Sequence, residues 1–197
     1  MPRRYDRAGT SKLLLDAAID EFADMGMHGA RVDRIAENAG TNKSGIYSYF
    51  GSKEDFFAAT IEAVMTRMAE EVPINAVPLD GDDLPGYAVQ LFDHVCDHPE
   101  VVRLFEHEAS HYADDLTAVP AFAARADAHG ARVRTIGEVT GDDVDPESLL
   151  MSVIAMAHWF VAAPQVVRMI YGPDHDEARR RYREHVRAMV TAVLAGP

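Results

Sequence analysis

The chain has 197 residues, of which 48% are hydrophobic and 26% are charged. This composition is typical of a chain that buries a core, and it argues against intrinsic disorder and collagen-like repeats. The single cysteine, Cys96, cannot form a disulfide within the chain, so a disulfide scaffold is excluded and nothing indicates an oxidising compartment.

Helices are predicted throughout, because apolar residues recur every three or four positions and alternating patterns are nearly absent. The first helix, 11–25, is predicted from the apolar face formed by Leu14, Ala18, Phe22 and Met25. Two short helices are predicted within 32–50, and further helices at 53–72, 87–97, 100–112, 120–139, 146–163 and 174–195. The sequence therefore predicts an all-α chain of about nine helices.

The helical pattern has one marked break, at the Pro- and Gly-rich segment 73–86, which is a candidate domain boundary. The helix before it, 53–72, is predicted to begin with a capping box. Ser52 and Asp55 have the required spacing, with Asp in place of the usual Glu.

The net charge of −13 is distributed unevenly. Residues 1–72 carry 9 Lys and Arg against 12 Asp and Glu, whereas residues 73–197 carry 10 against 20. The C-terminal part is therefore unsuited to a DNA surface, while a local basic face remains open for the first third. We interpret the arginine run at 179–183 as a solvated or acid-paired helix face.

No targeting or membrane segment is predicted. Arg3, Arg4 and Arg7 are not followed by the apolar stretch of a signal peptide. The longest uncharged stretch, 148–167, contains polar residues and a proline, so a buried helix is the better interpretation than a membrane span. We therefore expect a cytoplasmic protein without a membrane partner.

The segment 32–50, VDRIAENAGTNKSGIYSYF, has the spacing of a helix-turn-helix. Ala36 is small where the two helices cross, and Gly40 allows a positive φ at the turn. Ile46 fills the angle between the helices. An ordinary helical hairpin with a polar outer face remains the alternative.

The second helix of this pair separates an inner face from an outer one. Ile46, Tyr49 and Phe50 lie at i, i+3 and i+4 and are predicted to be buried. The outer face is formed by Lys43, Ser44, Tyr47 and Ser48. It has a cation, two hydroxyls and a phenol but no acid, which suits contact with base edges and phosphates in a major groove.

Several short motifs surround this pair. They are AA-x3-F in the first helix (Ala17, Ala18, Phe22), G-x2-V-x2-IA from Gly29 to Ala36, AG at 39–40, and SGIYSYFGSKED from Ser44 to Asp55. Together they resemble the DNA-binding domain of TetR-family transcriptional regulators over residues 10 to about 57. The chain length and the helical C-terminal part are also similar. The resemblance implies a helix-turn-helix domain, 1–55, and an effector-binding and dimerisation domain, 56–197, connected by the helix 53–72.

The resemblance assigns DNA contacts residue by residue. It implies that residues 41–44 meet base edges and nearby phosphates, and that Tyr47 and Lys53 contact backbone phosphates. The full predicted set is Arg31, Thr41, Asn42, Lys43, Ser44, Tyr47, Ser48 and Lys53. Arg31 departs from the family pattern, which usually has Thr or Ser there as a helix cap. Asp33 offers partial compensation of the helix dipole, and Arg31 is a candidate phosphate contact instead. The basic arm at residues 3–7 is a further candidate DNA contact, or a disordered tail.

The last two predicted helices carry apolar faces that suit a four-helix bundle with a second copy of the chain. The predicted interface residues are Leu149, Leu150, Val153, Ile154, Ala157, Val161, Tyr182, Val186, Met189 and Val193. Burial within one chain is the alternative for these residues. A two-fold dimer would bind a near-palindromic site on double-stranded DNA.

The resemblance also implies a pocket for a small organic effector among the central helices. Aromatic, Met and a few polar side chains suit such a ligand. The candidates are Phe92, Val95, Cys96, Leu104, Phe105, His107, His111, Phe122, Met151, His158 and Trp159. Each of them taken singly is also explained as ordinary core.

Residues 107–111 read His-Glu-Ala-Ser-His and match the H-E-x-x-H zinc motif on a predicted helix. No third ligand follows at a recognised spacing, so we predict polar or pocket-lining histidines, with no metal, no cofactor and no enzymatic activity. A zinc-dependent hydrolase using His107, Glu108 and His111 remains the alternative.

The sequence thus predicts a homodimeric, sequence-specific DNA-binding regulator, expected to be a repressor released by a small molecule. An effector-independent regulator or an activator on the same fold is the second alternative.

Overall fold

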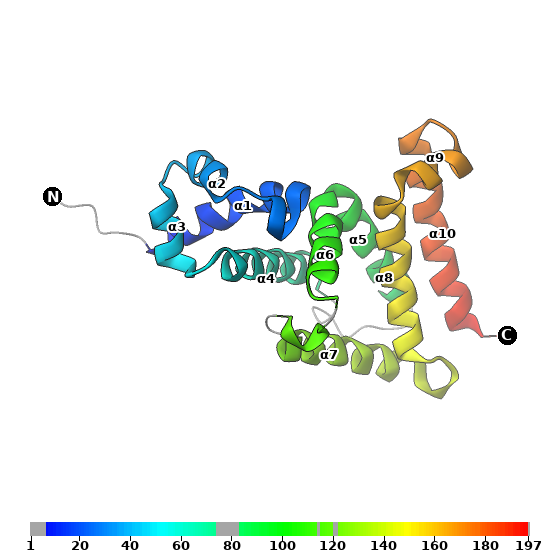
Figure 1. Cartoon of the computed structure of the whole chain (residues 1–197). Coiled ribbons are helices and arrows are strands. Elements are labelled where there is room, and N and C mark those ends of the chain that lie inside the picture. Colours follow the sequence, from blue (N-terminus) through cyan, green and yellow to red (C-terminus); the bar gives the residue numbers. More distant parts are fainter. Residues whose placement is uncertain (1–6, 74–82, 114, 120–121, 197) are drawn as a thin grey trace. The chain divides into compact units, whose positions relative to one another are not determined.

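The structure, a computed structural model, describes residues 7–73, 83–113, 115–119 and 122–196 (Figure 1). Within these ranges it contains ten α-helices, two short 3-10 helices and no strand, which confirms the all-α prediction. The α-helices are α1 (Arg7–Gly29), α2 (Val32–Asn38), α3 (Lys43–Phe50), α4 (Lys53–Glu71), α5 (Asp83–Asp97), α6 (Pro99–His111), α7 (Phe122–Thr140), α8 (Pro146–Ala162), α9 (Pro164–Tyr171) and α10 (His175–Ala195). The 3-10 helices are η1 (Leu116–Ala118) and η2 (Gly141–Asp143).

The helix that sequence reasoning missed is α9. Pro164 ends α8, because proline has no N–H to donate and its ring clashes with the preceding turn. The same proline then occupies the first turn of α9, where no N–H is needed. The uncharged stretch 148–167 thus spans two helices rather than one.

The chain divides into two compact units. One contains the described residues up to Arg67 together with those from Arg103 to Val119. The other contains the described residues from Met68 to Val102 together with those from Phe122 onward. Both α4 and α6 therefore begin in one unit and end in the other.

The first unit is built around an aromatic cluster. Phe22 on α1 meets Phe56 and Phe57 on α4 edge to face, at centroid distances of 5.5 and 5.1 Å. All three rings are fully buried, and each such side chain contributes about 1.5–3 kcal/mol through burial. Met25, predicted on the same face as Phe22, is instead 47% exposed, next to a break in α1 at Gly26, whose φ is +63°.

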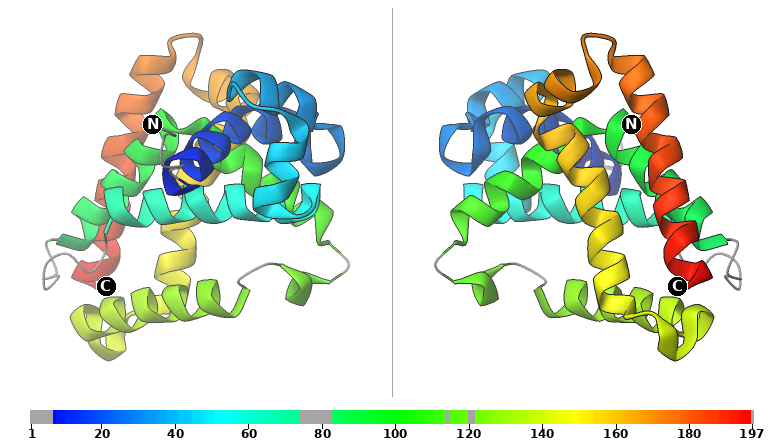
Figure 2. Two further views of the ribbon diagram at one scale, coloured as in Figure 1. Left: turned by 90° about the vertical axis from the view of Figure 1, so that its left-hand side faces the viewer. Right: turned by 90° about the vertical axis from the view of Figure 1, so that its right-hand side faces the viewer.

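The second unit is centred on α5, which packs against both α8 and α10, while α7 lies across α8 near its start (Figure 2). Its core includes Phe92, Ile136, Val153 and Val186, each no more than 4% exposed. Among the described residues no single helix is long and apolar enough to cross a membrane. The pair α8 and α9 reaches that length and apolarity only together, with a bend of 88°.

Three of the four arginines in the run on α10 are paired with acids, as predicted, whereas the exposed Arg181 lies over the ring of Tyr171. Arg179 Nη1 lies 2.6 Å from Asp97 Oδ1, and Arg183 Nε lies 2.7 Å from Asp93 Oδ2. Arg180 bonds to Glu177 and Glu184 on its own helix. These cations stabilise α10 and its contact with α5 rather than forming a free basic patch.

Candidate nucleic-acid interface

The start of α2 is held by a buried carboxylate instead of a side-chain cap. Arg31, at the N-cap position, makes no capping bond with its own side chain. Its backbone N–H donates to Glu21 Oε1 over 2.7 Å, and Glu21 Oε2 lies 3.2 Å from Arg34 Nη1. Glu21 is 6% exposed, so these contacts offset the cost of burying its charge. Glu21 on α1 therefore fixes α2 at the place where Arg31 replaces the capping Thr or Ser that the family usually has.

The turn between α2 and α3 depends on a small residue and a glycine, as predicted. Ala36 is 3% exposed, and its carbonyl accepts a hydrogen bond from the N–H of Thr41 over 2.9 Å. Gly40 has a φ of +64°, and a Cβ there would meet no atom within 4 Å. The backbone conformation, not lack of space, therefore requires glycine.

α3 is capped at its start and anchored from its inner side. Asn42 Oδ1 accepts a hydrogen bond from the N–H of Gly45 over 2.8 Å. Ile46 is fully buried, and the ring of Phe50 stacks on Phe56 with centroids 4.5 Å apart. Ile46 is thus buried as predicted, while Tyr49 and Phe50 on the same face are half-buried, and this packing fixes which side of α3 points outward.

The outer face of α3 is exposed. It consists of the predicted residues Lys43, Ser44, Tyr47 and Ser48. Lys43 Nζ lies 3.1 Å from Asp33 Oδ2 on α2, and the two side chains are 50% and 54% exposed. An exposed pair of this kind contributes little stability and is screened by salt, so a phosphate can replace Asp33 as the partner of Lys43.

Lys53, at the start of α4, is tied to the end of α1. Its Nζ donates to the backbone carbonyl of His28 over 3.1 Å, one of the carbonyls that a helix leaves without an internal partner. Partial burial lowers the pKa of Lys53. The ammonium group has three donors, so this bond leaves capacity for a phosphate.

The predicted capping box at the start of α4 is confirmed. The N–H of Asp55 donates to Ser52 Oγ over 3.0 Å, and the N–H of Ser52 donates to Asp55 Oδ2 over 3.2 Å. This reciprocal pair fixes the first turn of α4, and hence the position of Lys53.

All eight predicted DNA-binding residues lie in the first unit. Residues 41–48 lie on α3 or directly before it, Arg31 precedes α2 and is exposed, and Lys53 begins α4. Arg3 and Arg4 fall outside the described residues, and nothing is described of the Arg7 side chain. The DNA contacts of all these residues stay predictions.

The predicted effector-pocket residues are divided between the two units. Leu104, Phe105, His107 and His111 lie in the first unit, and Phe92, Val95, Cys96, Phe122, Met151, His158 and Trp159 lie in the second. Phe122, Met151 and Trp159 are 46%, 68% and 60% exposed. Phe92 and Val95, in contrast, belong to the buried core of the second unit.

A different group of residues lines a small cavity in the second unit. They are Met68, Val72, Tyr87, Leu91, His129, Arg132 and Ile154. The cavity has a volume of about 30 Å³. This is room for a water molecule, whereas pockets for organic ligands measure roughly 300–1,000 Å³.

Most of the predicted dimer residues pack within their own chain. Leu149, Leu150, Val153, Ala157 and Val186 belong to the core of the second unit, and Ile154, Val161 and Tyr182 pack against it. The reason is that α8 is apolar around most of its circumference, and its inward side covers α5. Met189 and Val193 are 43% and 39% exposed and line an open groove of about 850 Å³ along α8 and α10.

The H-E-x-x-H residues do not converge on a common point. His111 Nδ1 lies 3.3 Å from His28 Nε2, and its other ring nitrogen lies 3.5 Å from Glu54. The ring of His107 packs against Gly26, where a Cβ would come within 2.8 Å of it. In the described part of the chain, the group with metal-binding geometry is instead Glu71, His94 and His98. The zinc-hydrolase alternative therefore gains no support from the geometry.

Two family models match the chain. Residues 14–60 match the model described as bacterial regulatory proteins, tetR family, and residues 83–191 match the model described as tetracyclin repressor-like, C-terminal domain. The first covers most of α1, all of α2 and α3, and the start of α4, and the second covers the larger part of the second unit.

Curated relatives are transcriptional regulators. The HTH-type transcriptional repressor SCO4008 of Streptomyces coelicolor is 35% identical over 172 residues, which is 85% of this chain and 86% of the relative. The HTH-type transcriptional regulator RutR of Escherichia coli is 33% identical over 97 residues, which is 48% of this chain and 45% of the relative.

Solved structures share the whole fold. The transcriptional regulator SCO4942 from Streptomyces coelicolor superposes with a TM-score of 0.72 at 29% identity, covering 91% of this chain and 97% of that one. A TetR-like transcriptional regulator from Rhodococcus sp. RHA1 covers all of both chains, with a TM-score of 0.69 at 21% identity, and shows the same fold. The chain belongs to the TetR family of bacterial transcriptional regulators.

Proposed function

We propose that this protein is a homodimeric repressor that binds a near-palindromic operator through α3 of each subunit. A small organic molecule bound to the second unit releases it. The observation that carries the proposal is the outer face of α3, which is exposed, free of acids, and held in place by the Asn42 cap and the buried Ile46. The repressor role is supported by the relative SCO4008, whose name describes a repressor.

Gel-shift titration tests the DNA contact. The duplexes are the DNA upstream of the protein's own gene and a scrambled control of equal length. Affinity for the upstream fragment is expected to fall steeply with salt, because Lys and Arg contacts release counterions from phosphates. Tyr47→Ala should weaken binding, while the matched change Tyr171→Ala in the second unit should leave it unchanged. Equal affinity for both duplexes, or equal loss in both variants, would contradict the proposal.

The dimer is supported by the apolar groove along α8 and α10. Trp159, the only tryptophan of the chain, is 60% exposed on α8, and Val193 on α10 lines the groove. Covering apolar surface of this kind stabilises association. Two copies joined this way present two copies of α3, which should contact half-sites about 34–36 Å apart.

Sedimentation analysis of Val193→Glu tests the dimer. A charge in the groove should convert the protein to a monomer and shift Trp159 emission to longer wavelength. Thr191→Glu, which adds the same charge on α10 outside the groove, is the control and should stay dimeric. A wild-type protein that sediments as a monomer would remove the basis for two half-sites.

The effector is proposed to act by changing the shape of the second unit. The small cavity lined by Tyr87 and His129 has a volume of about 30 Å³, so an organic ligand that enters there would favour a conformation in which this cavity is larger. A panel of organic compounds is therefore expected to contain members that raise the unfolding midpoint and weaken operator binding together. If compounds raise the midpoint without weakening operator binding, the effector-independent alternative holds instead.

A further inference from the structure

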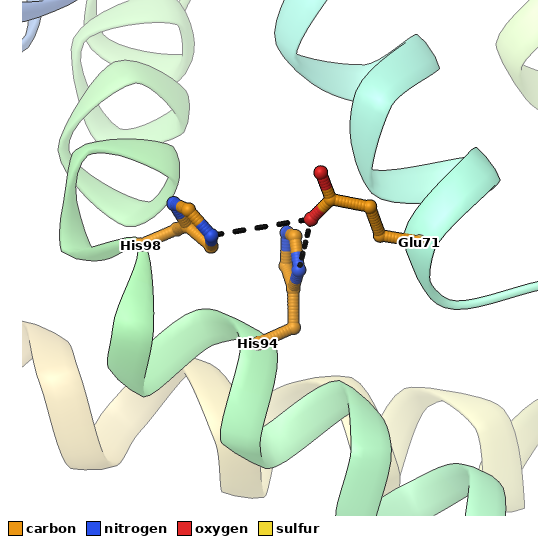
Figure 3. A group of neighbouring side chains, drawn as sticks. All are labelled: Glu71, His94 and His98. Atoms are coloured by element: carbon orange, nitrogen blue, oxygen red, sulfur yellow. Dashed lines mark ion pairs between the residues drawn. The ribbon is translucent and has the colours of Figure 1, made fainter.

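Three side chains from two separate segments converge in the second unit (Figure 3). Glu71 lies at the end of α4, His94 lies in the last turn of α5, and His98 follows α5 directly. The N–H of His98 donates to the carbonyl of His94 over 2.9 Å, so the two histidines lie one helical turn apart on the same side. Glu71 faces both of them.

The distances suit a shared ion. Glu71 Oε2 lies 3.2 Å from His94 Nδ1 and 3.9 Å from His98 Nε2, and all three ligand atoms lie within 4.8 Å of one another. A Zn²⁺ ion held about 2.1 Å from each ligand in a tetrahedron would separate the ligands by roughly 3.4 Å. The two separations that involve Glu71 are within about 0.5 Å of this value, and the two histidine ligand atoms lie no more than 4.8 Å apart, so small side-chain rotations can bring the three atoms into coordination distance.

A fourth residue orients one of the ligands. His98 Nδ1 lies 3.1 Å from Glu100 Oε1 in the first turn of α6. When a neutral His98 donates its Nδ1–H to Glu100, its Nε2 lone pair points toward the Glu71 oxygen. Two acceptors facing each other repel, and a cation between them removes the repulsion. Histidine ligands of metals usually have such a carboxylate behind them.

Burial distinguishes the site from an exposed acidic surface. The His94 side chain is 7% exposed, while those of His98 and Glu71 are 37% and 47% exposed. One ligand is thus fixed inside the unit, while the open side leaves access for an ion and a bound water.

We propose that Glu71, His94 and His98 form a binding site for a divalent first-row transition metal of the Zn²⁺ type, with Glu100 as a positioning residue. A set of two imidazoles and one carboxylate suits such metals, whereas Mg²⁺ and Ca²⁺ prefer sites made of oxygen ligands alone. The bound ion would join the end of α4 to the junction of α5 and α6. The proposal concerns metal binding alone and does not depend on the proposed DNA-binding function.

Cobalt spectroscopy on the full-length, metal-stripped protein tests the site. Co²⁺ is expected to bind with a stoichiometry of one per chain, to give the intense visible absorption of four-coordinate Co²⁺, and to be displaced by Zn²⁺. Glu71→Gln and His98→Gln should abolish this absorption. Glu100→Gln should weaken Zn²⁺ binding by about 10–100-fold, because it removes only the outer partner of His98.

Two histidine variants outside the site are the matched controls. His111→Gln removes a histidine of the H-E-x-x-H segment, and His185→Gln removes an exposed histidine on α10. Both should bind Co²⁺ as the wild type does. Circular dichroism checks that each variant folds. If His98→Gln fails to fold, Glu71→Gln still tests the site, because Glu71 is the more exposed side chain and its replacement disturbs the fold less.

Three results would overturn the proposal. They are no cobalt absorption with the wild type, unchanged absorption in Glu71→Gln, and loss of absorption in His111→Gln with Glu71→Gln unaffected. The first would leave Glu71 and His94 as an ordinary polar contact, and the last would move the site to the H-E-x-x-H segment.

Discussion

Cations are held in different ways on α3 in the first unit and on α10 in the second. In the first unit, Lys43 has an exposed partner, Asp33, at 3.1 Å. In the second unit, the guanidinium of Arg183 bonds to both oxygens of Asp93, at 3.0 and 2.7 Å, and Arg179 bonds to Asp97 at 2.6 Å. Guanidinium–carboxylate bonds of this kind are strong, whereas a single exposed lysine pair exchanges readily. A count of basic residues would favour α10 as the DNA surface, but the pairing favours α3.

The largest expected effect on stability comes from Glu21, the buried acid that holds the start of α2 and pairs with Arg34 in the first unit. Glu21→Ala removes the acceptor of the Arg31 N–H and should lower the free energy of unfolding by about 1–3 kcal/mol. Chemical denaturation measures this loss, with the exposed neighbour Asp20→Ala as the control. Equal stability of the two variants would show that Glu21 does not fix α2.

The next effect comes from the cap of α3. Asn42→Ala should cost about 1 kcal/mol of stability, because Gly45 loses its acceptor at the helix start, and Asn42→Ser should recover most of the loss. Operator affinity should follow the same order. If Asn42→Ser restores stability but not affinity, the Asn42 side chain contacts DNA in addition to capping α3.

The third effect tests whether a DNA phosphate replaces the carboxylate partner of Lys43. Lys43→Ala should weaken operator binding and reduce the slope of log affinity against log salt by about 1. Arg180→Ala, which removes an acid-paired cation from α10, should change neither. A slope that changes in Arg180→Ala and not in Lys43→Ala would reverse the comparison.

The smallest effect is expected at Cys96. Burial raises the pKa of its thiol to about 12, because it disfavours the charged thiolate; nearby Arg179 lowers the pKa, and Asp93 and Asp97 raise it. The thiol therefore stays protonated below that pH, and iodoacetamide should alkylate it far more slowly at pH 8 in the native protein than in the unfolded one. Equal rates would mean that burial in the second unit does not suppress the Cys96 thiolate.

Local features of the first unit were predictable from sequence. Ala36, Gly40 and Ile46 act within one helix-turn-helix, so their spacing alone defines their roles, and the Ser52–Asp55 box spans one helical turn. Glu21 could not be predicted as the partner of Arg31, because ten residues and a helix break separate them. Long-range packing, not local pattern, decides such contacts.

The second unit was less predictable for the same reason. An apolar helix such as α8 does not reveal which side it buries, so Val153 was predicted for a dimer surface and packs in the core. The spacing of His94 and His98 was a readable signal. Glu71 was not, because it approaches them only through the packing of α4 against α5.

Hydroxyl-radical footprinting on the DNA upstream of the protein's own gene tests the central claim, that the outer face of α3 lies along a duplex. The account predicts two protected patches on one side of the DNA, separated by about one helical turn or a multiple of it, and both lost in Tyr47→Ala. A protein that folds and associates normally yet protects no genomic fragment at low ionic strength would contradict it.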